Sequence, residues 1–145
     1  MNIKKITAHL KDFSNKKIII IGDIMLDEYH WCNVSRISPE APVPVCSVEK
    51  TTLVPGGAAN VAKNILMLES TPILIGTVGP DSSGEKLTQL LKNSNISPEN
   101  IIKDDTKPTI LKSRIVANQQ HIVRVDREDR QEISLKTQNH IYKKL

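Results

Sequence analysis

The chain of 145 residues has few aromatic side chains and few cysteines. Phe, Trp and Tyr make up 3% of it and hydrophobic residues 39%, so its core has to be built from Ile, Leu, Val and Ala. Cys32 and Cys46 form no CxxC pair, and the four histidines show no metal-ligand spacing. We therefore expect reduced thiols and no metal site.

Long apolar runs and runs of like charge are also missing. No apolar stretch approaches the ~20 residues of a membrane span, and the polar N-terminus MNIKKITAHLKDFSNKK is unlike a signal peptide. The net charge is +4, but the lysines are scattered, with no run longer than two and no interleaved aromatics. These absences predict a cytoplasmic protein without a membrane or nucleic-acid partner. Its lysine-rich surface would also suit an anionic small molecule.

The sequence does contain an alternation of apolar strands and amphipathic helices. The run KKIIIIGD, residues 16–23, is apolar on both faces and predicts a strand inside a parallel sheet covered by helices. TPILIGTVG, residues 71–79, predicts a second such strand. Further expected elements are helices at 1–15, 58–69, 84–95 and after Ser134 as N-cap, a short strand near 95–103, and a hairpin over 108–126 that turns near Asn118 and Gln119.

Residues 29–50 differ from the rest because they alternate and carry Pro39, Pro42 and Pro44. Proline confines strands to sheet edges. We therefore predict two edge strands, near 28–34 and 43–50, joined by a proline-rich turn as a flap outside the main sheet. Because two parallel strands cannot form a covered sheet, we also expect the chain to be the front part of a larger α/β domain.

The segment PGGAANVAK, residues 55–63, looks like a phosphate loop, yet it matches neither the G-x-x-x-x-G-K-[ST] nor the G-x-G-x-x-G pattern. Gly56 and Gly57 would let backbone approach a ligand, and Asn60 offers two donors and an acceptor. That inventory suits hydroxyl groups better than phosphate. A plain turn before a small-residue helix is an equally good interpretation.

Acidic residues follow the first predicted strand, at the end where parallel sheets place their ligands. A lone carboxylate there more often caps a turn, but Asp23 and Asp27 together, beside a Gly-Gly-Asn turn, favour polyol binding.

Basic residues alternate along the predicted hairpin. Lys112 and Arg114 share one strand face, and Gln120, Arg124 and Asp126 are expected to share one on the other strand. Arg and Lys together suit a phosphate or carboxylate. A charged strand facing solvent gives the same pattern.

Several segments, in this order, resemble the N-terminal part of the ribokinase-like carbohydrate kinases: MLDEY, SRISPEAPVPV, PGGAANVA and SRIVANQQHIVRVD. The glycine segment by itself indicates only the wide family. SRISPEAPVPV makes the resemblance specific for the heptose 7-phosphate kinase modules of the bifunctional kinase/adenylyltransferases of Gram-negative bacteria. The resemblance covers residues 18–126.

This resemblance implies an α/β fold, namely part of a three-layer αβα sandwich with a small β-strand lid at about residues 28–50. Such a lid often forms the contact of a homodimer. The substrate-binding residues implied are Asp27, Gly56, Gly57, Asn60, Lys112 and Arg114, with Asp23 adjacent to them, while Arg36 and Glu40 in the lid turn would close over the substrate.

The family transfers a phosphoryl group from ATP, with Mg²⁺, to a sugar hydroxyl. For the heptose subfamily the acceptor is D-glycero-β-D-manno-heptose 7-phosphate, in the biosynthesis of ADP-heptose and the lipopolysaccharide inner core. The D-T-x-G-A-G-D motif, which carries the catalytic base, and the adenylyltransferase module have no match here. The resemblance therefore implies no catalytic residue in this chain.

We thus expect the sugar-binding portion of a kinase, inactive as an isolated chain unless a complementary C-terminal fragment completes it. The alternatives are a non-catalytic truncated remnant, acting at most as a sugar-phosphate-binding or dimerisation module, and a fragment of another ribokinase-like sugar kinase. The reading frame downstream of Leu145 would distinguish a split kinase from a remnant.

Overall fold

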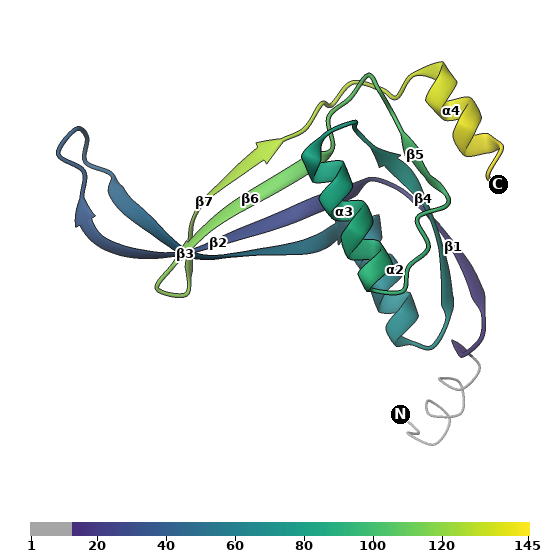
Figure 1. Ribbon diagram of the computed structural model, residues 1–145, viewed down its shortest axis with the longest axis horizontal. Helices are drawn as coiled ribbons and strands as arrows, with labels where there is room; N and C mark the ends of the chain where they lie inside the picture. Colours follow the sequence, from purple (N-terminus) through teal and green to yellow (C-terminus); the bar gives the residue numbers. More distant parts are fainter. Residues whose placement is uncertain (1–12) are drawn as a thin grey trace, which may run out of the picture.

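The computed structural model describes residues 13–145, which build a mixed α/β fold around two sheets (Figure 1). One sheet is parallel with the strand order β1-β4-β5, and the other has the order β3-β2-β6-β7, in which only β2 and β6 are parallel. The strands are β1 (Lys17–Ile21), β2 (Ile24–Ile37), β3 (Pro44–Gly57), β4 (Thr71–Val78), β5 (Ile101–Lys103), β6 (Ile110–Ala117) and β7 (Gln120–Arg127). The helices are α2 (Ala58–Met67), α3 (Ser82–Asn93) and α4 (Leu135–Tyr142).

The parallel sheet contains both predicted apolar strands, β1 and β4. The prediction that helices cover both faces of the first strand is wrong. In β4, Leu74 and Ile75 are fully buried. In β1, Ile19 and Ile21 are each 51% exposed, although β1 pairs with β4 in register. The reason is that β1 lies at an edge of the described sheet, and α2 and α3 leave much of its surface uncovered.

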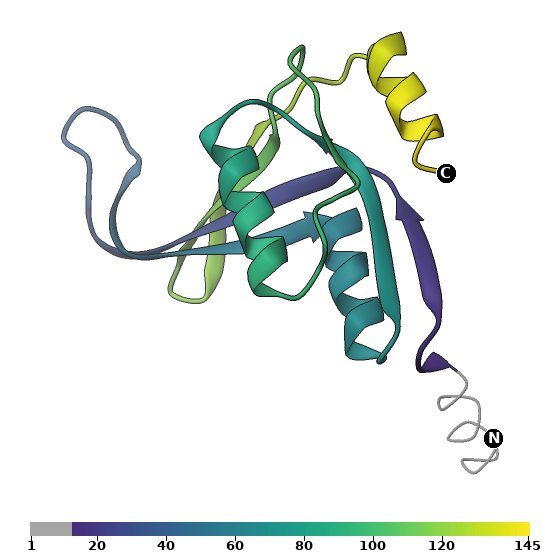
Figure 2. The same cartoon turned by 45° about the vertical axis from the view of Figure 1, so that its right-hand side comes forward.

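Helices α2 and α3 lie side by side, whereas α4 lies apart from them, beyond the ends of β1 and β5 (Figures 1 and 2). In α2 the small residues Ala59 and Ala62 are completely buried, which lets the helix backbone approach the sheet closely. In α3 the predicted inward residues Leu87 and Leu91 are completely buried. The core joins both sheets; its buried members are Ile24, Leu26, Ala59, Ala62, Leu74, Val78, Leu87, Leu91 and Ile96.

The flap predicted at 28–50 is present as a long hairpin of β2 and β3 that projects from the body (Figure 1). Its strands are longer than expected, and the prediction that both are edge strands is wrong for β2. The prolines at 39 and 42 fall in the turn, so that β2 keeps every backbone N–H. It can therefore pair with β3 on one side and with β6 on the other.

The hairpin of β6 and β7 turns at Asn118 and Gln119 as predicted, and both have positive φ, 50° and 62°, as a two-residue type I′ turn requires. A bulge between Ile115 and Val116 shifts the pairing of β7. It places Gln120 opposite Ala117, on the other face from Arg124, so the prediction that these two residues share a face is wrong.

The short strand β5 and helix α4 also follow the predicted pattern. Ser134 caps α4 by accepting a hydrogen bond from the backbone N–H of Thr137 at 3.1 Å. Most of the helix expected at 1–15 lies outside the described residues. Within residues 13–145, no helix is long and apolar enough to cross a membrane.

Candidate sugar-binding site

Charged side chains gather on one face of the four-stranded sheet, here called the front face. Backbone register aligns them in rows that cross β2, β6 and β7. The first row contains Asp27, Lys112 and Asp126, and the second contains Tyr29, Arg114 and Arg124. The sheet therefore unites the predicted residues Asp27, Lys112 and Arg114, which lie far apart in the sequence.

Asp27 and Arg114 form a short ion pair across these rows. Arg114 Nη1 lies 2.6 Å from Asp27 Oδ1, and their side chains are only 15% and 17% exposed. Burial lowers the pKa of Arg114, but the hydrogen bond and the charge of Asp27 raise it more, so that its net pKa is raised. Asp27 is thereby fixed through one of its two carboxylate oxygens.

The other oxygen of Asp27, Oδ2, faces Gly56. A β-carbon at Gly56 would collide with Oδ2, so glycine is what lets the Asp27 carboxylate pack against the backbone here. Gly57 has φ 58° and a β-carbon there would collide with the carbonyl oxygen of Asp23. Helix α2 begins at the next residue, with Asn60 exposed in its first turn. The glycine pair thus joins the end of β3 to α2 beside Asp27.

Lys112 has a different environment from the one predicted. Its Nζ donates to Asp126 at 3.0 Å and to Glu128 at 3.1 Å. These hydrogen bonds raise the pKa of Lys112 despite its burial. Two carboxylates therefore already neutralise this amine, which makes it a poorer ligand for phosphate than an amine without such partners.

An aromatic cluster beside Arg114 escaped the sequence-based prediction. The guanidinium carbon of Arg114 lies 5.1 Å from the centre of the Tyr29 ring. Tyr29 stacks on Trp31 at 6.0 Å, and His121 approaches its edge at 6.4 Å. Strand alternation could have predicted the position of two of these rings. Tyr29 and Trp31 lie two and four positions after Asp27 and so share its face.

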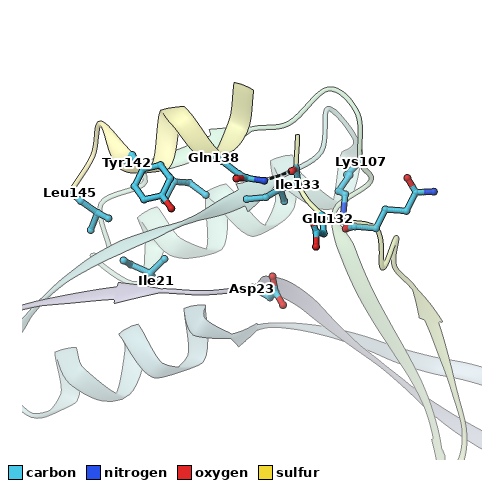
Figure 3. A pocket seen from close by; sticks show the side chains of 10 residues that line it. Ile21, Asp23, Lys107, Glu132, Ile133, Gln138, Tyr142 and Leu145 are labelled. Atoms are coloured by element: carbon cyan, nitrogen blue, oxygen red, sulfur yellow. Dashed lines mark hydrogen bonds between the residues drawn. The ribbon is translucent and has the colours of Figure 1, made fainter. Parts of the chain in front are cut away.

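Asp23 is exposed and turned toward a different depression, a groove of about 610 Å³ next to α4 (Figure 3). The groove also contains Ile21, Lys107, Gln131, Glu132, Ile133, Gln138, Ile141, Tyr142 and Leu145. None of the front-face residues lines it. The structure therefore separates the side chain of Asp23 from that of Asp27, although the two residues are only four positions apart.

Arg36 and Glu40 lie at the far tip of the lid hairpin and are exposed. Nine strand residues from Asp27 to Arg36 correspond to roughly 30 Å. Within one chain, these lid residues therefore lie far from Asp27, and their closing over the substrate stays a prediction.

Comparison with known proteins identifies the family. The pfkB family of carbohydrate kinases matches residues 15–144. The chain belongs to this family. It is 48% identical over 113 residues to the bifunctional protein HldE of Helicobacter pylori strain P12. The matched region covers 78% of this chain and 24% of that protein. It is 41% identical to HldE of Sulfurimonas denitrificans, covering 86% of this chain and 26% of that protein.

Solved structures of a ribokinase and of a sugar kinase share the fold. An Arabidopsis thaliana ribokinase, solved with ribose and ATP, matches with a TM-score of 0.60 and 15% identity over 79% of this chain and 36% of its own. A Pyrococcus horikoshii sugar kinase solved with ATP matches with a TM-score of 0.55 and 26% identity, over 77% and 34% of the two chains. The chain thus has a ribokinase-like fold and spans about a quarter of the curated relatives.

Proposed function

We propose that this pfkB-family chain is the sugar-binding portion of an ATP-dependent heptose 7-phosphate kinase that acts in ADP-heptose biosynthesis. The observation that carries the proposal is the carboxylate of Asp27, held by Arg114 at Oδ1, while Oδ2 accepts no hydrogen bond from any of residues 13–145. A carboxylate oxygen in such a setting accepts hydrogen bonds from sugar hydroxyls. The 41–48% identity to HldE proteins supports a heptose as the sugar.

The substrate is proposed to be D-glycero-β-D-manno-heptose 7-phosphate, with its ring hydroxyls on Asp27 Oδ2 and on the amide of Asn60. Gly56 and Gly57 would allow the sugar to approach the backbone. The chain would orient the acceptor and exclude water from it, which is the positioning part of phosphoryl transfer.

ATP and Mg²⁺ are proposed to bind to a part of the kinase other than these residues. Within residues 13–145, no group of three or more His, Cys, Asp or Glu side chains could hold a metal ion. The sequence also lacks the D-T-x-G-A-G-D motif. We therefore expect the chain by itself to show no ATP-dependent phosphorylation of the heptose. Turnover above background would contradict that expectation.

A homodimer formed through the lid is proposed as the assembly, in the cytoplasm. Val48 of the lid and Val123 and Val125 of β7 are exposed on the face of the sheet opposite the front face. Exposed apolar patches of this kind often mark protein contacts. Sedimentation over a range of concentrations tests this assembly, and a monomer throughout would contradict it.

Calorimetric titration with heptose 7-phosphate tests the sugar site. Asp27→Asn keeps the shape of the side chain but removes its charge, so we expect affinity to fall roughly tenfold or more. Glu28→Gln is the matched control because Glu28 lies on the opposite face of β2, bonded to His30 and Ser113. Equal affinity of wild type and Asp27→Asn, or no binding by folded wild type, would contradict the proposal.

A further inference from the structure

Two arginines with the same charge face each other directly across the β6–β7 hairpin. Arg114 and Arg124 are register partners on the front face. Like charges directly opposite one another destabilise a sheet, and arginine does not lose its proton to relieve the repulsion. Each guanidinium here has its own carboxylate: Arg114 binds Asp27 at 2.6 Å, and Arg124 binds Asp126 at 2.9 and 3.1 Å.

Both guanidinium groups keep donors that these ion pairs do not use. Among the described residues, Arg114 donates through Nη1, and Arg124 donates through Nε and Nη2. This leaves Nε and Nη2 of Arg114 and Nη1 of Arg124 available. The Arg124 side chain is 56% exposed, whereas that of Arg114 is 15% exposed. One guanidinium is thus held in place and the other is open to solvent.

The arginine pair lies beside Asp27 on the front face. The backbone row of Arg114 and Arg124 is two residues, roughly 7 Å, from the row of Asp27, and the Arg114 guanidinium reaches back to 2.6 Å from Asp27 Oδ1. A hydroxyl-bearing ring at Asp27 could therefore reach this row with a phosphate on its side arm. Lys112, the other cation nearby, is held by two carboxylates, Asp126 and Glu128, and its side chain is 16% exposed, against 56% for Arg124.

We propose that Arg114 and Arg124 together form a clamp for the phosphate group of the substrate, and that Arg124, not Lys112, is its second cation. This inference rests on the proposed sugar site at Asp27. Guanidinium groups suit the task because their planar donor pairs match phosphate oxygens. The clamp would make the site selective for a phosphorylated sugar over the free sugar.

The test compares heptose with heptose 7-phosphate as titrants of the full chain. Trp31 supplies a signal, since it is the one tryptophan of the sequence and stacks on Tyr29, which contacts Arg114. We expect wild type to prefer the 7-phosphate by about tenfold or more, because charge-assisted hydrogen bonds add to affinity. Arg124→Gln should lose most of this preference while it retains affinity for free heptose, and Arg124→Lys should retain part of it.

Arg127→Gln is the matched control, because it removes the same charge from the same strand. Arg127 pairs with Leu111 and so lies on the opposite face. Full preference for the 7-phosphate in folded Arg124→Gln, or equal loss in both glutamine variants, would overturn the clamp and leave the sugar site intact. Equal binding of the two sugars by wild type would do the same. Failure of wild type to bind either sugar would instead overturn both the sugar site and the clamp.

Discussion

At the scale of single residues, the two carboxylate oxygens of Asp27 have different surroundings. Oδ1 is held by Arg114, whereas Oδ2 packs against Gly56 and accepts no hydrogen bond from the residues that the structure describes. A fixed carboxylate loses less freedom on binding a sugar than a mobile one, which favours affinity. We therefore propose that Arg114 positions Asp27 for the sugar, in addition to its proposed contact with phosphate.

Gly57 is the residue at which the backbone itself constrains the site. Its φ of 58° is unfavourable for any residue with a β-carbon, and such a carbon would collide with the carbonyl of Asp23. We expect Gly57→Ala to lower the free energy of unfolding by about 1–3 kcal/mol. Gly22→Ala is the control, because a β-carbon there would lie 3.3 Å from Ala58 Cβ. Chemical denaturation would reveal the difference, and equal stability of the two variants would refute it.

The residue types of the site were predictable where they follow local rules. Asp27 at a strand end and the glycine pair before a helix could be recognised in the sequence. The environment of Lys112 could not, because its partners Asp126 and Glu128 lie 14 and 16 positions away across a hairpin. Which cation is free and which is neutralised depends on that tertiary pairing.

At the scale of elements, Asp81 ties helix α3 to the start of β6. One carboxylate oxygen accepts from the backbone N–H of Gly84 at 2.8 Å, and the other accepts from that of Thr109 at 2.8 Å. Burial raises the pKa of Asp81, but these hydrogen bonds outweigh it and hold the pKa below its ordinary value of 3.8. One side chain thus caps a helix and fixes the loop before β6.

The lowered pKa of Asp81 predicts how its contribution depends on pH. A carboxylate whose pKa is lower in the folded state stabilises fully above its unfolded pKa, and this stabilisation is lost as pH falls through the folded pKa. We expect Asp81→Asn to lower the free energy of unfolding by about 1–2 kcal/mol at pH 7. The difference from wild type should shrink below pH ~4. Urea denaturation across pH would show it, with the exposed Asp105→Asn as control; a difference independent of pH would contradict the assignment.

The elements also show where sequence periodicity succeeds and fails. Helices α2 and α3, strand β4 and the turn at Asn118 follow from local pattern, capping and turn chemistry. The face of Gln120 does not, because a bulge in the hairpin reverses the alternation that the sequence suggests. Similarly, local sequence could not show that β2 pairs on both sides.

At the scale of the whole molecule, the chain combines the four-stranded sheet, which carries the proposed sugar site, with a parallel sheet whose first strand is partly uncovered. Ile19 and Ile21 were expected to be covered, because a strand apolar on both faces usually lies between layers. In the structure they are half-exposed, and the groove beside α4 contains the apolar side chains of Ile21, Ile133 and Tyr142. We propose this surface as the contact for a complementary C-terminal part of the kinase.

Binding of a sugar phosphate by Asp27 and the glycine turn can be followed by backbone amide NMR of the full chain during titration with heptose 7-phosphate. Each residue other than proline has its own amide signal, so the contact site is read residue by residue. We predict that the shift changes concentrate at Asp27, Gly56, Gly57 and Asn60 and extend to Arg124. Changes confined to the groove of Ile21, Ile133 and Tyr142, or no changes at all in a folded chain, would contradict the claim.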